Sequence, residues 1–279
     1  MKNHLGTVLV LGASGKTGSR VARRLEDLGV AVRKGSRSGN PPFDWEDEST
    51  WDQILQGVHS VYITFQPDLA VPGAEVCIRK FVNHAKKPGM HKLVLLSGRG
   101  EPEAQRCEQI VMESGLKWTI VRASWFNQNF SEGYLLDPIL AGYVSLPAGD
   151  VKEPFVDADD IAEVVVASLT QEGHDGKCYE VTGPHLLTFK EAIAEISRVA
   201  NRTIEYNQLS LSDYQSMLKE YNVPTAVIDL MSYLFSEVMD WRNASIARGV
   251  AEALGREPKD FGEYVSTAAD NKVWSVDKN

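Results

Sequence analysis

The feature that most constrains the fold is a glycine-rich turn near the start of the chain. Residues 12–18 read Gly-Ala-Ser-Gly-Lys-Thr-Gly and stand between an apolar run and a helical pattern. In a strand–turn–helix unit, Gly12 permits the sharp turn, Gly15 lets backbone N–H groups approach a phosphate, and Gly18 lets the helix lie close to the sheet. The helix N-terminus adds positive potential for an anion. This order predicts a cradle for the pyrophosphate of a dinucleotide.

Two other interpretations of the turn exist. The glycines are spaced G-x-x-G-x-x-G rather than G-x-G-x-x-G, and many strand-to-helix turns carry glycines for packing alone. Gly15-Lys16-Thr17 also resembles the end of a P-loop, but the first glycine of a P-loop would fall at Val10. The P-loop is therefore excluded, whereas the packing alternative stays open.

Short runs rich in branched residues alternate with helical segments through the first two-thirds of the chain. We expect strands at residues 8–11, 30–32, 61–65, 93–97, 119–122 and 178–182, with helices at 16–28, 51–56, 74–85, 103–114 and 159–169. Such alternation is typical of right-handed βαβ crossovers. The pattern predicts an α/β fold, a doubly wound parallel Rossmann sheet.

The character of the sequence changes beyond residue 183. Thr188 and Glu191 form a capping box at the start of a helix at 188–200, and further helices are expected at 212–221 and 224–239. We therefore expect a Rossmann core at 1–130, continued by 153–183. Residues 131–152 and 184–279 would form a smaller, mainly helical C-terminal lobe, with a loosely held tail at 271–279.

Charge and composition exclude several classes of protein. A net charge of −9 makes an electrostatic nucleic-acid surface unexpected. No signal peptide or membrane-length apolar run is visible, and three cysteines, far apart in sequence and odd in number, indicate reduced thiols, so we expect a cytoplasmic protein. The six histidines lack metal-site spacing, so no metal is expected. The late apolar helices are a possible homodimer face.

The region after the second expected strand favours NADP(H) over NAD(H). NAD-specific folds place an acid about 20 residues past the glycine turn. Here residues 33–38 read Arg-Lys-Gly-Ser-Arg-Ser, with no acid. Arg37 can bind a 2′-phosphate through two parallel N–H bonds, assisted by Ser36, Ser38 and Lys16. The alternative is that these are solvated surface charges.

Several segments together resemble the NmrA-like branch of the atypical short-chain dehydrogenase/reductases. They are Gly-Ala-Ser-Gly-Lys-Thr-Gly (12–18), Gly-Ser-Arg-Ser (35–38), Leu-Val-Leu-Leu-Ser (93–97), Trp-Thr-Ile-Val-Arg (118–122), Trp-Phe-x-x-Asn (125–129) and Pro-Phe-Val-Asp-x-x-Asp-Ile-Ala (154–162). Residues 43–51 are also similar to the festuclavine/agroclavine dehydrogenases of that branch. The resemblance implies an NAD(P)-binding fold whose members include reductases of quinones, imines and dyes, and non-catalytic redox sensors.

The resemblance also implies which residues bind the cofactor. The pyrophosphate would be held by the glycine turn, the 2′-phosphate by Arg37, and the adenine, ribose and nicotinamide by strand-end residues. In order along the chain these are Gly12, Ser14, Gly15, Lys16, Thr17 and Gly18 for the pyrophosphate, Asp44 and Trp45 for the adenine, Thr64 and Phe65 for the ribose and nicotinamide, and Ser97 and Gly98 beside the nicotinamide.

The expected catalytic acid is missing. Classical members of the wider superfamily carry Tyr-x-x-x-Lys soon after the serine at this strand end, but residues 99–110 contain neither Tyr nor Lys. No catalytic residue is certain, and the weak candidates are Ser97, Arg99 and Glu108. Ser97 has the alternative of a hydroxyl bonded to backbone or cofactor, and Arg99 with Glu108 that of a surface ion pair.

An apolar pocket is expected beyond the next strand. Trp125 and Phe126 would form a wall over the nicotinamide with Asn129 as a polar anchor, unless all three are core packing. We therefore expect an NADPH-dependent reductase of a small apolar imine, enone or quinone. The alternative is a non-catalytic NADP(H) sensor that acts through a protein partner.

Overall fold

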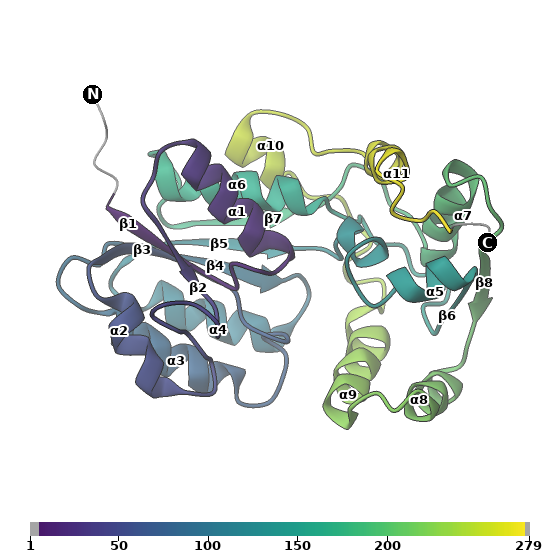
Figure 1. Ribbon diagram of the computed structural model, residues 1–279, viewed down its shortest axis with the longest axis horizontal. Coiled ribbons are helices and arrows are strands. Elements are labelled where there is room, and N and C mark those ends of the chain that lie inside the picture. Colours follow the sequence, from purple (N-terminus) through teal and green to yellow (C-terminus); the bar gives the residue numbers. More distant parts are fainter. Residues whose placement is uncertain (1–5, 277–279) are drawn as a thin grey trace. The chain divides into compact units, whose positions relative to one another are not determined.

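The computed structural model describes residues 6–276 and divides the chain into two compact units (Figure 1). The first unit, the sheet unit, runs up to Ala123 and is completed by Ala158–Val181 and Arg248–Arg256. The second unit comprises Ser124–Asp157, Thr182–Ala247 and the chain from Glu257 onward.

The sheet unit is built on six parallel strands in the order β2-β1-β3-β4-β5-β7. The strands are β1 (Thr7–Leu11), β2 (Val32–Gly35), β3 (Val58–Ile63), β4 (Lys92–Gly98), β5 (Lys117–Ala123) and β7 (Lys177–Val181). The four central strands are almost continuously buried, as expected of strands covered on both faces. The predicted doubly wound parallel fold is confirmed.

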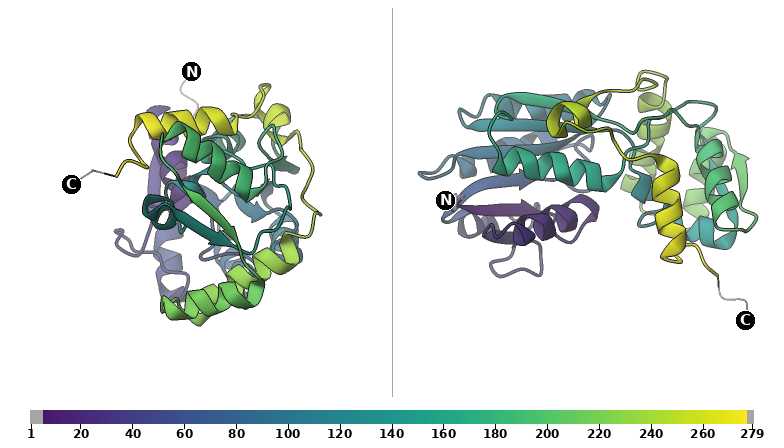
Figure 2. Two further views of the ribbon diagram at one scale, coloured as in Figure 1. Left: turned by 90° about the vertical axis from the view of Figure 1, so that its right-hand side faces the viewer. Right: turned by 90° about the horizontal axis from the view of Figure 1, so that it is seen from above.

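Helices cover both faces of this sheet. One face carries α1 (Lys16–Asp27), α6 (Ala158–Thr170) and α10 (Gly249–Leu254), and the other carries α2 (Trp51–Leu55), α3 (Ala74–Ala85) and α4 (Pro102–Met112). Figure 2 shows α1 and α6 running alongside each other. Their position follows from the right-handed crossovers between parallel strands.

The predicted second strand at residues 30–32 is wrong in its limits, since β2 covers Val32–Gly35. Gly29 adopts a left-handed φ of +73°, and the Val30 N–H donates to the Leu25 carbonyl at 3.0 Å. This backbone bond closes the end of α1 in the manner of a glycine C-cap. Val30 therefore belongs to the helix ending rather than to the strand.

The prediction that residues 184–279 all belong to the second lobe is wrong for Arg248–Arg256. A β-carbon on Gly249 would overlap the backbone of Glu180 in β7, so α10 lies directly on the sheet unit. Arg256 also pairs with Asp160, 2.7 Å away, and with Glu163 on α6. The close contact that Gly249 permits and the ion pairs of Arg256 thus hold Arg248–Arg256 on the sheet unit.

The second unit contains most of the later helices and a small sheet. Its elements are η2 (Asn127–Phe130), α5 (Leu136–Ala141), β6 (Tyr143–Leu146), α7 (Phe189–Val199), β8 (Glu205–Gln208), α8 (Leu211–Glu220), α9 (Thr225–Tyr233), the π-helical turn η3 (Leu234–Val238) and α11 (Phe261–Asp270). The parallel pair β6–β8 was not predicted. The capping box of α7 is confirmed, because Thr188 and Glu191 exchange bonds of 3.0 and 2.7 Å.

The prediction of a loose tail from residue 271 is also wrong where the structure describes it. Trp274 is 1% exposed, and its indole N–H donates to the Phe130 carbonyl at 2.8 Å. Its ring meets that of Tyr264 edge-on. Trp274 is therefore anchored in the core of the second unit, with the partly buried Val273 packed against it, while Asn271 and Lys272 are exposed. Residues 277–279 lie outside the described part.

Candidate functional site

The glycine turn between β1 and α1 has the tight geometry that the sequence predicts. Gly12 has a φ of +61°, and the Gly15 N–H donates to the Gly12 carbonyl at 2.8 Å. A β-carbon on Gly18 would overlap that same carbonyl, so α1 can approach the turn only with glycine here. A β-carbon on Gly12 would likewise meet the hydroxyl of Thr64 at the end of β3.

The N-terminus of α1 is arranged to receive an anion. Its N-cap is Gly15, which offers no side chain to the first-turn N–H groups, and the first turn contains no acid. The positive end of the helix dipole is therefore not neutralised by a capping side chain. Ser14 is exposed and Lys16 half-buried at this end.

Thr17 has a structural contact in addition to the cofactor role that the resemblance implies, which stays a prediction. Its side chain is 5% exposed, and its hydroxyl accepts a 3.0 Å bond from the Tyr62 hydroxyl on β3. Burial of Tyr62 raises the pKa of its phenol well above the ordinary value, so Tyr62 is a proton donor in this bond. The Thr17 side chain thus joins α1 to the sheet, and the proton of its hydroxyl is not used in this bond.

The basic residues in β2 and directly after it differ in whether their side chains are bound to other residues. Arg33 donates to the carbonyls of Ile54 and Gln56, at 2.7 and 2.6 Å, and Lys34 pairs with Glu26 at 2.9 Å. Arg37 is exposed and has no hydrogen bond or ion pair to the described residues.

A fixed turn carries Arg37. The Ser36 carbonyl accepts the N–H groups of Gly39, at 3.0 Å, and Phe43, at 2.9 Å. Ser36 is half-buried and Ser38 exposed on the same turn. Of the basic side chains at residues 33–37, Arg37 is the one with its hydrogen-bonding capacity unused by the described residues.

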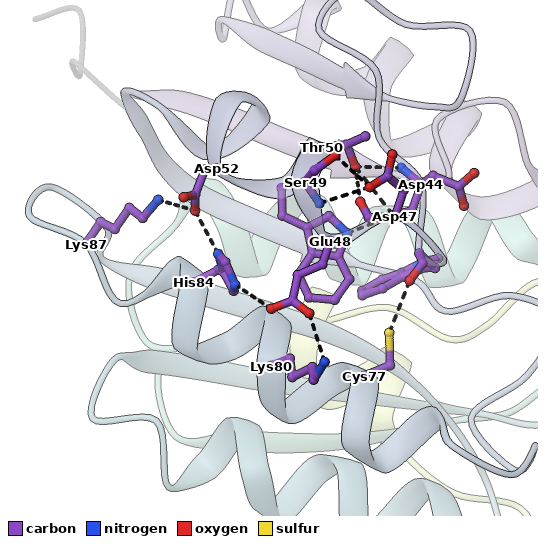
Figure 3. A network of polar contacts seen from close by, with 12 residues as sticks. Asp44, Asp47, Glu48, Ser49, Thr50, Asp52, Cys77, Lys80, His84 and Lys87 are labelled. Carbon is purple, nitrogen blue, oxygen red and sulfur yellow. Dashed lines mark hydrogen bonds and ion pairs between the residues drawn. The ribbon is translucent and has the colours of Figure 1, made fainter.

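The segment expected near the adenine is fastened to α3. Figure 3 shows Glu48 and Asp52 meeting side chains of that helix: Glu48 bonds Lys80 at 2.8 Å and His84 at 3.0 Å, and Asp52 bonds His84 at 2.7 Å and Lys87 at 2.5 Å. These carboxylates, Asp52 first, raise the pKa of His84.

Beneath these ion pairs lies an aromatic cluster. The Trp45 ring lies 4.9 Å from Phe43 and 5.0 Å from Phe65 between ring centroids. The Trp45 indole N–H donates to the Thr64 carbonyl at 3.1 Å, and the Trp51 indole N–H donates to the Asp44 carbonyl at 2.7 Å. Asp44, Trp45, Thr64 and Phe65 therefore form one rigid group at the end of β3.

The three weak catalytic candidates belong to one structural network, and the predicted ion pair between Arg99 and Glu108 is wrong. Glu108 is 1% exposed and bonds Arg122 through both carboxylate oxygens, at 2.7 and 2.5 Å. Its Oε1 also accepts from the Ser97 hydroxyl at 2.6 Å. Arg99 instead pairs with Glu180 at 3.1 Å, as does Arg122 at 3.2 Å.

The sheet register explains this pairing. Ser97, Arg122 and Glu180 are direct neighbours on β4, β5 and β7, so their side chains project from the same side of three adjacent strands. The hydrogen bond to Glu108 raises the pKa of the Arg122 guanidinium further above its ordinary value. The network joins three strand ends to α4 and leaves the Ser97 hydroxyl already donating.

Sequence reasoning missed a second acid at this edge. Glu101 is 7% exposed, and a β-carbon on Gly98, at the end of β4, would overlap its carboxyl group. This carboxyl lies within hydrogen-bonding reach of that of Asp68, which follows β3. An acid three residues past a glycine at a strand end was the available signal.

The expected pocket residues lie in the second unit. The Trp125 ring packs edge-on against Phe189 and tilted against Phe235, with centroids 5.3 Å away in both cases. Phe126 pairs its backbone with Val156, and the Asn129 N–H donates to the Phe126 carbonyl. Trp125 thus contributes to the core of its own unit, and the wall over the nicotinamide stays a prediction.

The described residues contain neither a metal-binding cluster nor a membrane-spanning helix. Between residues 6 and 276, no three or more His, Cys, Asp and Glu side chains gather in a group that could hold a metal ion. Over the same part of the chain, every helix is too short or too polar to span a bilayer.

Comparison with known proteins agrees with this geometry. An NAD(P)H-binding family model matches residues 12–172, and the model of the NmrA-like family matches residues 103–265. The agroclavine dehydrogenase of Claviceps fusiformis is 31% identical, over 96% of this chain and 98% of that protein. The NAD(P)H azoreductase of Xenophilus azovorans is 27% identical, over 94% and 98%.

Among solved structures, the NADPH complex of the NADPH-dependent quinone oxidoreductase from Escherichia coli is similar, with a TM-score of 0.74. It is 22% identical, over 93% of this chain and 99% of that one, and supports the fold. The family models and the full-length relatives together confirm the predicted resemblance. The chain belongs to the NmrA-like family of NAD(P)H-binding proteins.

Proposed function

We propose that this protein is an NADPH-dependent reductase that transfers hydride to a small, apolar, electron-poor acceptor such as an imine, an enone or a quinone. The observation that carries the cofactor preference is the state of Arg37, which is exposed on a turn, in a segment (residues 33–38) without an acid, while Arg33 and Lys34 are engaged elsewhere. A guanidinium in that position suits the 2′-phosphate that distinguishes NADPH from NADH.

The residues around the glycine turn fit such a cofactor. The α1 N-terminus and Gly15 would meet the pyrophosphate, with Ser14 and Lys16 beside them. The rigid group of Trp45 and Phe65 would border the adenine and ribose. The cofactor supplies the hydride, and the protein binds and orients it.

The acceptor class rests on the relatives and on the candidate pocket. The similar proteins named above act, by their names, on a clavine alkaloid, azo compounds and quinones. Azo compounds and quinones are electron-poor, and an alkaloid amine becomes electron-poor when it is oxidised. Trp125, Phe126 and Asn129 are the residues that we propose for the acceptor side, since aromatic walls with one polar anchor suit such molecules.

Calorimetric titration with NADPH, NADP⁺ and NADH tests the cofactor assignment. Arg37→Ala is expected to weaken NADPH binding about 10- to 100-fold, the equivalent of about 1.5–3 kcal/mol for charged hydrogen bonds, and to leave NADH unchanged. Lys34→Ala removes the same charge from the neighbouring ion pair and is the matched control. Equal weakening of NADPH and NADH by Arg37→Ala would contradict the assignment.

Turnover distinguishes the reductase from the alternative sensor. The reductase is expected to oxidise NADPH in the presence of quinone, enone or iminium acceptors. Tight NADPH binding without oxidation by any of these acceptors would favour a non-catalytic NADP(H) sensor acting through a protein partner. No binding of any nucleotide would remove both.

A further inference from the structure

Two carboxyl groups meet at the carboxyl edge of the sheet, where β3 and β4 end. Asp68 lies in the loop after β3, and Glu101 lies at the start of α4, three residues past the end of β4. They lie within hydrogen-bonding reach of each other, and the Glu101 carboxyl occupies the space that a side chain on Gly98 would fill. Glu101 is the N-cap of α4, yet its side chain does not cap that helix.

The pair is buried and incompletely satisfied. Glu101 is 7% exposed, Asp68 is half-buried, and Oε2 of Glu101 has no hydrogen-bond partner among the described residues. Two ionised carboxylates repel each other and neither can donate, so a hydrogen bond between these groups requires one proton. A buried carboxyl oxygen without a partner is costly in a purely structural role.

The surroundings keep that proton in place. Burial, then the charge of Asp68 and its hydrogen bond, raise the pKa of Glu101 to about 9. The other charged groups acting on it, Glu103 and Glu108 of α4, are also acidic and act in the same direction. The Asp68 pKa is raised as well, chiefly by burial. At neutral pH the pair therefore holds a proton.

A reductase of a neutral acceptor needs such a proton. Hydride transfer leaves negative charge on the acceptor, which a positioned acid can neutralise. Residues 99–110 contain neither Tyr nor Lys, and the Ser97 hydroxyl already donates to Glu108, which is held by Arg122. Glu101 is the buried acid of this segment that still carries a proton.

We infer that the Asp68–Glu101 pair stores the proton that a neutral acceptor takes up after hydride transfer, with Glu101 as its donor. The inference rests on the proposed reductase function. The nicotinamide cofactor gives the acceptor a hydride, forming a C–H bond and leaving the oxidised cofactor. The acceptor heteroatom then takes the Glu101 proton, and the O–H electron pair stays on the carboxyl group as a second negative charge. Water restores the proton to the pair.

The inference separates two classes of acceptor. A neutral quinone becomes anionic when it accepts hydride and therefore benefits from the acid. A cationic dye becomes neutral and needs no proton. Menadione and malachite green are suitable probes of the two classes. Glu101→Gln retains the size of the side chain but removes its acidic proton. Glu103→Gln removes a carboxylate that helps to raise the Glu101 pKa but leaves the Glu101 proton in place, so the rate ratio at neutral pH should stay near that of the wild type.

The experiment measures NADPH oxidation by both probes in the wild type, Glu101→Gln and Glu103→Gln. We expect Glu101→Gln to lower the menadione-to-malachite-green rate ratio about 100-fold, the lower end of what a positioned acid contributes. In the wild type this ratio should fall as the pH rises through about 9, because the protonated pair is the active form. In Glu101→Gln the ratio should not change with pH.

An infrared titration provides a readout independent of turnover. The carbonyl stretch of a protonated carboxylic acid should persist at neutral pH, disappear near pH 9, and be absent from Glu101→Gln. An unchanged rate ratio in Glu101→Gln, or no such band in the wild type, would overturn the inference while the reductase function stands. Failure of the wild type to bind NADPH or to reduce either probe would instead overturn the reductase function, and proton delivery with it.

Discussion

Glu108→Ala is expected to destabilise the sheet unit by about 4 kcal/mol. The substitution leaves the buried Ser97 hydroxyl without its acceptor, which costs about 1–3 kcal/mol. It also removes one partner of a buried ion pair, a loss of about 3–5 kcal/mol when the remaining charge is fully buried. Arg122 is 23% exposed and retains Glu180, so the lower end of that range applies.

Urea unfolding followed by circular dichroism measures this loss. Gln109→Ala, on the exposed face of the same helix, is the control and should change stability by less than about 0.5 kcal/mol. A double-mutant cycle with Ser97→Ala should give a coupling energy of about 1 kcal/mol for the hydroxyl–carboxylate bond. A loss below about 1 kcal/mol in Glu108→Ala would refute the structural role of the network and return Glu108 to the catalytic candidates.

Three further substitutions test other parts of the chain. Gly18→Ala should cost about 1–3 kcal/mol of stability and weaken NADPH binding, because its β-carbon overlaps the Gly12 carbonyl; urea unfolding and calorimetry measure the two effects. Asp52 is the main cause of the raised pKa of His84. The ion pairs of protonated His84 should therefore contribute fully to protein stability below pH 6.5, the ordinary pKa of histidine, and this contribution should be lost as the pH rises through the raised pKa. Melting temperatures at several pH values should show this loss in the wild type and not in His84→Gln. Trp274→Ala should cost about 3–5 kcal/mol in urea unfolding, whereas a freely moving tail would show no loss.

The sequence predicts the fold well where local and periodic signals agree. The limits of α3 match the predicted 74–85, and the glycine turn has the conformation that its spacing indicates. Both follow from short-range rules: apolar periodicity for the helix and backbone freedom for the glycines. The same rules place the carboxyl ends of the strands, and with them the candidate site, at one edge of the sheet.

Partners across strands could not be predicted in this way. Arg99 and Glu108 are close in sequence and suggested a pair, but the register of β4, β5 and β7 aligns Arg122 with Ser97 and Glu180. For Glu101 the sequence offers only the strand-end glycine three residues earlier, and its interaction with Asp68 joins segments more than 30 residues apart, so the pair could not be predicted.

The sheet unit is discontinuous along the chain, and this affects how it can fold. The chain leaves or rejoins the unit after Ala123, Asp157, Val181, Ala247 and Arg256. All six strands have been synthesised once the ribosome passes Val181. Helix α10, which contacts β7 and α6, is made later, in the last segment that returns to the sheet unit. A shortened chain ending at Val181 would leave β7 without that cover. The sheet unit thus has all its strands early but acquires its last helix only after Thr182–Ala247 of the second unit has been translated.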